Sequence, residues 1–152
     1  MDFFQEGYVH ALKYLTLKAR TERELVDYLK KKGFTEETII DIIGRLKSLN
    51  YVNDYEYARQ YIELTGTNKS MSLEMMKIKL LQRGISLEVI KQALKDSSTE
   101  ELGHCITILR KKLKDKEYLL DNQQRIKVKS YLYRKGFTSE TIHRALEAIF
   151  DE

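Results

Sequence analysis

Apolar residues recur every three or four positions along almost the whole chain, which is the spacing that places them on one face of an α-helix. Nine segments carry this pattern, beginning with residues 2–18 and ending with the segment that contains Ile142, Ala145 and Ile149. The β-branched residues follow the same spacing, and no turn dipeptide lies between two alternating runs, so no β-hairpin is expected. The pattern therefore predicts an all-α protein.

One local pattern occurs three times. Each copy is a helical run that ends at a glycine, followed by an apolar residue, then Thr or Ser, with a Glu two positions after it. The glycines are Gly33, Gly84 and Gly136, and they lie 51 and 52 residues apart. A nearly constant period of this length indicates tandem copies of one supersecondary unit.

The residue types in this pattern suit a tight corner between two helices. Glycine readily adopts the left-handed conformation that ends a helix, and the apolar residue after it can fold back onto that helix. Thr or Ser can cap the next helix, and a Glu in its first turn interacts favourably with the helix dipole. Each copy therefore predicts a helix, a corner and a second helix.

A further helix is expected upstream of each corner. Ala11, Ala58 and Cys105 are 47 residues apart in both steps, and each is followed four positions later by a large apolar residue. This pairing of a small with a large residue is typical of a helix face packed closely on a neighbour. We therefore predict three tandem three-helix repeats, at residues 1–53, 54–98 and 99–152.

Two finer predictions concern the middle repeat. Asp54 is expected to cap the first helix of that repeat, because aspartate is a favoured N-cap residue. Residues 66–70, with the sequence Gly-Thr-Asn-Lys-Ser, are expected to form the loop after this helix.

The composition supports the helical interpretation and narrows the cellular setting. The 152 residues include no proline and only seven glycines, which agrees with long helices and few irregular loops. No apolar run approaches the roughly 18 residues that a membrane-spanning helix needs, and the first residues lack the pattern of a signal peptide. A single cysteine excludes an internal disulfide and fits a reducing compartment. We therefore expect a cytoplasmic protein that does not contact a membrane.

Positive charge is concentrated in the last repeat. The chain carries a net charge of +4, and residues 101–152 contain 11 Lys or Arg against 8 Asp or Glu. Such an excess favours an acidic partner or nucleic acid, although it is mild for a dedicated DNA-binding protein. The densest basic region combines two neighbouring segments of this repeat, and its cations are Lys111, Lys112, Lys114, Lys116, Arg125, Lys127, Lys129, Arg134 and Lys135.

Residues suited to catalysis or metal binding do not form a recognisable set. His10, His104 and His143 lack the spacing of metal ligands. Cys105 occupies the small position of its repeat, so a packing residue is favoured over a nucleophile or a ligand. The glycines are isolated, so no phosphate-binding loop is expected. We therefore expect no enzymatic activity, no metal and no cofactor.

The ten tyrosines suggest nucleobase stacking as a further use of the surface. Most of them, including Tyr14, Tyr28 and Tyr131, fall on helical faces, where a half-buried tyrosine is the ordinary outcome. The better contact candidates, which we expect to be exposed, are Tyr55, Tyr118 and Tyr133.

These motifs, taken in order, resemble the RecX family of recombination regulators over residues 8–149. A single helix–glycine–helix copy carries little information, whereas three copies in this order, with an Asn-Asp-x-x-Tyr-Ala joint between the first two, are specific. The resemblance is carried by Arg20-Thr21-x-x-Glu24-Leu25, Leu29-x-x-x-Gly33-Phe34, Asn53-Asp54-x-x-Tyr57-Ala58, Leu80-x-x-x-Gly84-Ile85 and Leu132-x-Arg134-Lys135-Gly136-Phe137.

The resemblance implies an elongated, curved array of three-helix repeats without catalytic residues. Members of the family bind the RecA recombinase by lodging in the helical groove of its filament on single-stranded DNA. They limit filament extension, strand exchange, ATP hydrolysis and the co-protease activity that triggers the SOS response, and some also bind DNA directly. We therefore expect a monomeric negative regulator of RecA, with weak binding to single- or double-stranded DNA.

The residues expected to contact the RecA filament or DNA are cations at the corners and in the basic region, together with Arg20 before the second helix. They are Arg20, Lys31, Lys32, Arg83, Lys111, Lys112, Lys127, Lys129, Arg134 and Lys135. Two other functions stay open. One is a DNA-binding module that acts without RecA, since helix–corner–helix units resemble helix-turn-helix elements. The other is a helical scaffold for a different acidic protein.

Overall fold

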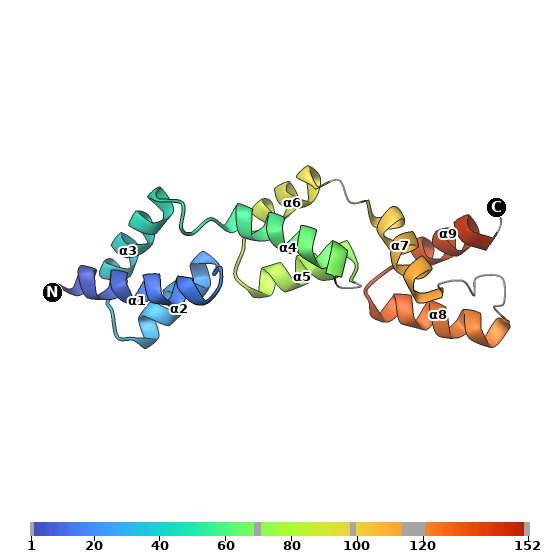
Figure 1. Cartoon of the computed structure of the whole chain (residues 1–152), viewed down its shortest axis with the longest axis horizontal. Helices are drawn as coiled ribbons and strands as arrows, with labels where there is room; N and C mark the ends of the chain where they lie inside the picture. Colours follow the sequence, from blue (N-terminus) through green and yellow to red (C-terminus); the bar gives the residue numbers. More distant parts are fainter. Residues whose placement is uncertain (1, 69–70, 98–99, 114–120, 151–152) are drawn as a thin grey trace. The chain divides into compact units, whose positions relative to one another are not determined.

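The computed structural model describes residues 2–68, 71–97, 100–113 and 121–150. Within these residues it contains nine α-helices and no strand, which confirms the all-α prediction (Figure 1). The helices are α1 (Phe3–Leu17), α2 (Glu22–Lys31), α3 (Glu36–Ser48), α4 (Asp54–Asn68), α5 (Leu73–Gln82), α6 (Leu87–Asp96), α7 (Glu101–Leu113), α8 (Asn122–Arg134) and α9 (Ser139–Phe150).

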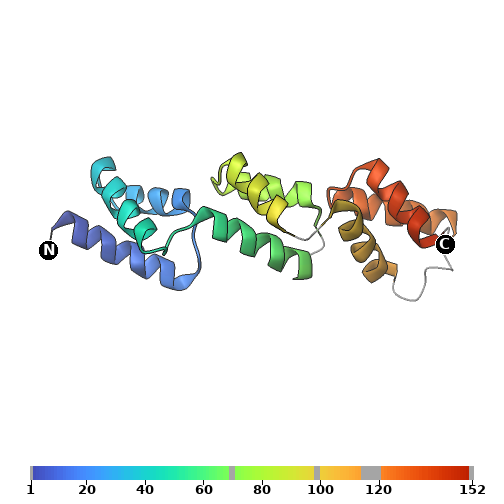
Figure 2. The same ribbon diagram turned by 90° about the horizontal axis from the view of Figure 1, so that it is seen from above.

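The chain divides into two compact units. The N-terminal unit comprises Met1–Gln60 and Lys79–Ala93, and the C-terminal unit comprises Tyr61–Ile78 and Leu94–Glu152. Helices α1, α2 and α3 group together in the first, and α7, α8 and α9 group together in the second (Figures 1 and 2). The middle helices α4, α5 and α6 contribute to both units, and the residue boundaries of the three repeats stay a prediction.

Each unit has a core where the three helices of its outer repeat meet. The fully buried residues include Ala11, Leu25, Leu29, Ile42 and Leu46 in the N-terminal unit, and Cys105, Leu109, Leu132 and Ala145 in the C-terminal unit. The packing role expected for Cys105 is confirmed. Burial, with a smaller contribution from the charge of Glu101, raises the pKa of its thiol to about 12. The thiol is therefore protonated, and unreactive as a nucleophile, at neutral pH.

All three predicted corners form. Gly33, Gly84 and Gly136 have φ angles of 94°, 91° and 101°, in the left-handed region. In the first corner the N–H of Phe34 donates to the carbonyl oxygen of Leu29 at 3.2 Å, and the glycine N–H donates to the carbonyl three residues before it at 3.0 Å. The other two corners contain the same pair of hydrogen bonds. Each of these helices therefore ends in a Schellman motif.

The predicted helix caps after the corners also form. The side-chain oxygens of Thr35, Ser86 and Thr138 each accept the backbone N–H three residues later, at 3.2 or 3.3 Å. At the start of α2, Thr21 and Glu24 form a reciprocal capping box. Local chemistry is therefore sufficient to begin these helices where the sequence predicts.

The predicted role of Asp54 is wrong. Asn53 caps α4, because its Oδ1 accepts the N–H of Glu56 at 3.0 Å. The Oδ1 of Asp54 instead accepts the N–H of Glu22 at 2.9 Å, at the start of α2. The chain reaches this position after a turn at Asn50, whose φ is 60°. Asp54 therefore links its own helix to the preceding repeat.

The loop predicted at residues 66–70 is also partly wrong. Helix α4 continues to Asn68, so Gly66 lies within the helix, and Lys69 and Ser70 lie outside the described residues. Thr65 is buried at 4% exposure, so α4 is still packed one residue before the expected break. A polar composition without proline was not enough to end the helix here.

The same junction joins successive repeats in each unit. In the N-terminal unit the second corner lies against the start of α2, where the Thr21 hydroxyl donates to the carbonyl of Arg83 at 2.8 Å. In the C-terminal unit the third corner lies against the start of α5, where the Ser72 N–H donates to the carbonyl of Lys135 at 3.0 Å. A carboxylate completes each junction. Glu101 accepts the N–H of Leu73, the first residue of α5, at 3.0 Å. Asp54 likewise accepts the N–H of Glu22, the first residue of α2, at 2.9 Å.

Both junction carboxylates are partly removed from water. Burial raises the pKa of Asp54 above its ordinary value, and the hydrogen bond from Glu22 offsets part of this effect. Burial likewise raises the pKa of Glu101, and its bond from Leu73 opposes the shift. The two groups therefore experience the same balance between desolvation and hydrogen bonding.

Candidate interaction groove

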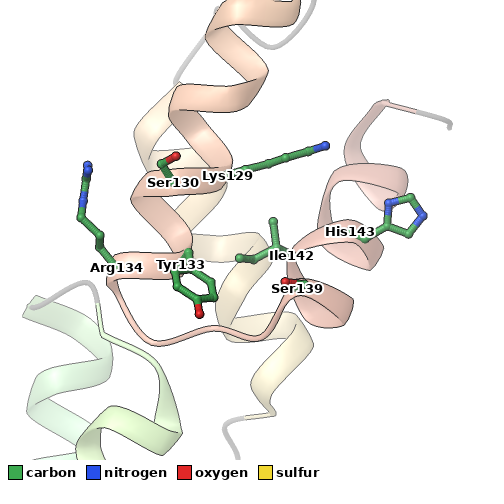
Figure 3. Close-up of a pocket in the computed structure, with 7 residues that line it drawn as sticks. All are labelled: Lys129, Ser130, Tyr133, Arg134, Ser139, Ile142 and His143. Carbon is green, nitrogen blue, oxygen red and sulfur yellow. The ribbon is translucent and has the colours of Figure 1, made fainter.

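The third repeat contains a groove between α8 and α9, beside its corner. The groove has a volume of about 510 Å³. Its lining residues are Lys129, Ser130, Tyr133, Arg134, Ser139, Ile142 and His143 (Figure 3). Lys129 and Arg134 are two of the ten predicted contact residues, and the fold brings them to one site.

The charged side chains have different directions at this site. Figure 3 shows Lys129 extending from α8 across the hollow toward α9, with Ile142 between the two helices. Arg134 points away from the hollow at its opposite edge, and His143 points outward from α9. Ile142 is 4% exposed and belongs to the core, so it forms an apolar floor.

The corner explains why these residues meet. Lys129 and Tyr133 are four positions apart on α8, so they share one face of that helix. The corner then returns the chain as α9, whose first residue, Ser139, borders the same hollow. The positive end of the α9 dipole therefore lies beside the groove. Tyr133 is 66% exposed, as predicted, and its ring is available for contact.

The electrostatic character of the groove is cationic. Lys129 and Arg134 are exposed, and none of the described residues that line the hollow is acidic. His143 Nε2 lies 3.0 Å from Oε1 of Glu147 on the next turn of α9. An anionic group entering the groove therefore meets Lys129 and a helix N-terminus, with the charge of Arg134 at the edge, a combination that suits a carboxylate or a phosphate.

A second cluster of predicted residues surrounds Tyr131 on α8. The Lys112 ammonium lies 4.5 Å from the centre of the Tyr131 ring, and the Lys135 ammonium lies 5.2 Å from it. One half-buried ring therefore holds two predicted cations in place by cation–π contacts. Arg125 has a similar contact, with its guanidinium carbon 4.8 Å from the ring centre of Phe150.

The predicted cations of the N-terminal unit are held by tyrosines in the same way. The guanidinium of Arg20 lies 3.8 Å from the ring centre of Tyr14, which stacks on Tyr28 at 4.0 Å. The Lys32 ammonium lies 5.5 Å from the centre of the Tyr28 ring. These four side chains form one ladder, so Arg20 and Lys32 contribute to packing as well as to surface charge.

The remaining predicted cations are distributed over the surface. Arg83 donates a hydrogen bond to the hydroxyl of Tyr57 and lies over its ring at 5.7 Å. Lys31, Lys111 and Lys127 are exposed and do not line the third-repeat groove. Lys114, Lys116 and Tyr118, which belong to the same set of predictions, lie outside the described residues.

Sequence reasoning missed four residues of the groove: Ser130, Ser139, Ile142 and His143. In the sequence His143 is considered only as a metal ligand, and its spacing from the other histidines argues against that role. A signal was present in the repeat itself, because Lys129 and His143 occupy positions that are apolar in the first repeat. Comparing the repeats position by position would have identified this change.

None of the helices in the described ranges combines the length and the hydrophobicity required to cross a bilayer.

Two family descriptions match the chain. The description "RecX, first three-helix domain" matches residues 8–46, and "RecX, third three-helix domain" matches residues 99–146. The second match contains the whole groove between α8 and α9.

Curated relatives and solved structures agree with these matches. "Regulatory protein RecX" of Bacillus pumilus (strain SAFR-032) is 34% identical over 99% of this chain and 57% of its own length. "Regulatory protein RecX" of Caldanaerobacter subterraneus subsp. tengcongensis is 34% identical over 93% of this chain and 70% of its own length. The chain thus spans little more than half the length of the Bacillus relative. The structure titled "Crystal structure of RecX from Lactobacillus salivarius" is similar with a TM-score of 0.81 at 25% identity, over 96% of each chain.

Proposed function

The chain belongs to the RecX family, and from that premise we propose that it is a negative regulator of the RecA recombinase. It binds in the groove of the RecA filament on single-stranded DNA. Binding limits filament extension, strand exchange, ATP hydrolysis and the co-protease activity of the SOS response. The protein acts as a monomer in the cytoplasm and needs no cofactor.

The observation that carries this proposal is the cationic groove in the third repeat. The groove lies within a segment that matches a RecX domain, and Lys129 extends over it while Arg134 stands at its edge. A filament on DNA presents phosphates as well as protein, so a cationic groove on a helical framework suits such a target. A regulator of this kind needs no catalytic group, because a ligand that prefers one state of an assembly shifts its populations by binding alone.

The proposal is tested by charge reversal in the groove. We expect Lys129→Glu combined with Arg134→Glu to weaken inhibition of RecA ATP hydrolysis on single-stranded DNA by about tenfold or more, because both cations are exposed and two attractions become repulsions. The matched control is Lys91→Glu combined with Lys95→Glu, which changes the net charge equally on α6, outside this groove. Equal inhibition by the groove variant and the wild type would remove the groove from the mechanism.

Direct DNA binding without RecA is the second candidate. The observation that favours it is the exposed ring of Tyr133 beside the cations of the groove, a combination found in surfaces that bind single strands. It predicts tight binding to a single-stranded oligonucleotide that weakens steeply with salt and does not require RecA. Weak binding of this kind together with strong inhibition of filaments would favour the first candidate.

A further inference from the structure

The first repeat contains an equivalent groove with a different lining. The hollow between α2 and α3 has a volume of about 310 Å³. Its lining contains the apolar or small residues Val26, Ile39, Ile40, Ile43 and Gly44, together with the charged residues Glu22, Lys30, Glu36 and Lys47. We call this hollow the first-repeat groove.

The two grooves occupy the same place in their repeats. The first and third corner glycines are 103 residues apart, and this offset relates the lining of one groove to that of the other. Val26 corresponds to Lys129, and Ile40 corresponds to His143. Because both corners have the same hydrogen bonds, the difference between the grooves lies in their side chains.

Ile40 is a large apolar residue that is exposed and does not belong to the core of its own repeat. Its exposure is 64%, whereas Ile39 and Ile43 on the same helix are buried at 2% and 5%. The core therefore already uses the inward face of α3, and Ile40 lies outside it. A large apolar side chain exposed at the edge of an apolar hollow is typical of a surface that a partner covers.

Gly44 is the second feature that the chain's own packing does not explain. It lies within α3, where glycine is less favourable than any residue except proline. A Cβ at Gly44 would have no atom within 4 Å, and its φ is not in the left-handed region. Gly7, by contrast, is tightly packed, since a Cβ there would collide with Ile42. The missing side chain at Gly44 therefore keeps the groove open to another backbone.

The charges around the first-repeat groove are mixed. Lys47 Nζ lies 3.4 Å from Oε2 of Glu22, so these two charges face each other. Lys30 and Glu36 add one charge of each sign. A polyanion such as DNA would meet carboxylates here, whereas a protein segment with an apolar residue between a positive and a negative residue would match both charges and the apolar lining.

We propose that the first-repeat groove is a docking site for a protein segment of this chemistry. The segment places one apolar side chain against Ile40 and brings its backbone close to Gly44. This inference rests on the proposed function, and it identifies the segment as part of the RecA protein in the filament. The third-repeat groove then binds the anionic component of the filament.

The test uses two variants of the first-repeat groove and one matched control. Gly44→Ala adds a methyl group to an exposed helix, so we expect it to raise Tm by about 3 °C. If a partner backbone lies there, the same methyl group weakens binding to a preassembled RecA filament on oligo(dT) by about tenfold. We expect Ile40→Gln to weaken binding by a similar factor, because it removes the apolar contact without affecting a buried position.

Gly103→Ala is the control, because Gly103 is an exposed glycine on α7 whose Cβ would also have no atom within 4 Å. We expect it to keep wild-type binding. The docking site would be supported if Gly44→Ala gains stability but loses binding to the filament, while Gly103→Ala keeps its binding. A merely structural role of Gly44 cannot raise stability and lower binding together.

Other outcomes would overturn the inference. Wild-type affinity of both Gly44→Ala and Ile40→Gln for the filament would exclude the groove and leave the proposed function standing. A folded wild-type chain that does not bind the filament would overturn both. Light scattering measures whether the chain forms a dimer. If the wild type is a dimer and Ile40→Gln is a monomer, a second copy of the chain covers the groove, which would also overturn the inference.

Discussion

The grooves of the first and third repeats share one backbone design and differ in the side chains that line it. Each lies beside a corner with a left-handed glycine and a Schellman motif. Val26 and Ile40 line the first, whereas Lys129 and His143 stand at the same positions in the third. Both repeats therefore form the hollow, and the side chains at the positions beside it determine whether the hollow suits an apolar or an anionic group.

The largest effect is expected from breaking the corner itself. Gly136→Ala would force a non-glycine residue to φ of 101° and push its Cβ against Ser72 and Met75. We expect a loss of about 3 kcal/mol in the free energy of unfolding, measured with urea.

Gly33→Ala sharpens this prediction, because Gly33 has a φ of 94° but an added methyl group there would meet no atom within 4 Å. It should lose only about 1 kcal/mol, from backbone strain alone. Equal losses at the two glycines would show that contact with the start of α5 adds nothing to the third corner.

An exchange of groove chemistry tests the comparison directly. Lys129→Val combined with His143→Ile gives the third groove the residues of the first at these two positions, and we expect about tenfold weaker binding to the RecA filament at low salt. Both positions are exposed, so the free energy of unfolding should change by less than about 0.5 kcal/mol. Unchanged binding in fluorescence anisotropy, with a normal urea transition, would show that these two side chains do not determine binding.

A smaller effect is expected at the junction that each unit contains. Asp54→Ala and Glu101→Ala each remove the side-chain acceptor of a backbone N–H at a helix start. We expect each to lower the free energy of unfolding by about 0.5–1 kcal/mol. A loss at only one of the two positions would show that the junctions are not equivalent despite their common geometry.

The smallest effect concerns pH. Because burial raises the pKa of Asp54 and Glu101, the folded protein holds these protons more tightly than the unfolded chain. Their contribution to stability is therefore full below the ordinary carboxyl pKa and is lost as pH rises through the raised value.

Asp54→Asn and Glu101→Gln keep the acceptor oxygen but do not titrate. We expect each to become more stable relative to the wild type, by a few tenths of a kcal/mol, between about pH 3 and pH 6. The measurement is urea unfolding of each variant and the wild type at several pH values. If the stability of the variant relative to the wild type stays constant or falls over this range, burial is not the dominant influence on the pKa of that carboxyl.

The sequence predicts the elements whose chemistry is local. Gly33 and Thr35 specify a corner and a cap within a few residues, so the helices on either side begin and end as expected. The core position of Cys105 is predicted correctly because its spacing matches that of Ala11. These features depend on backbone conformation and helix periodicity, which a single chain displays directly.

The features that sequence reasoning missed depend on contacts between distant segments. Asp54 has the residue type of an N-cap, and only the fold places its carboxylate against Glu22, 32 residues away. The third-repeat groove combines Lys129 with Ile142, which meet because a corner reverses the chain. The boundaries of the repeats and the contacts with RecA stay predictions.

The decisive experiment is RecA ATP hydrolysis on single-stranded DNA at two salt concentrations, with the wild type and with the Lys129→Val, His143→Ile variant. We expect inhibition by the wild type at substoichiometric amounts, which is weaker at high salt, and a clear loss of inhibition in the variant at low salt. No inhibition by a folded wild type, or equal inhibition by both chains at both salt concentrations, would contradict a RecA regulator that acts through the third-repeat groove.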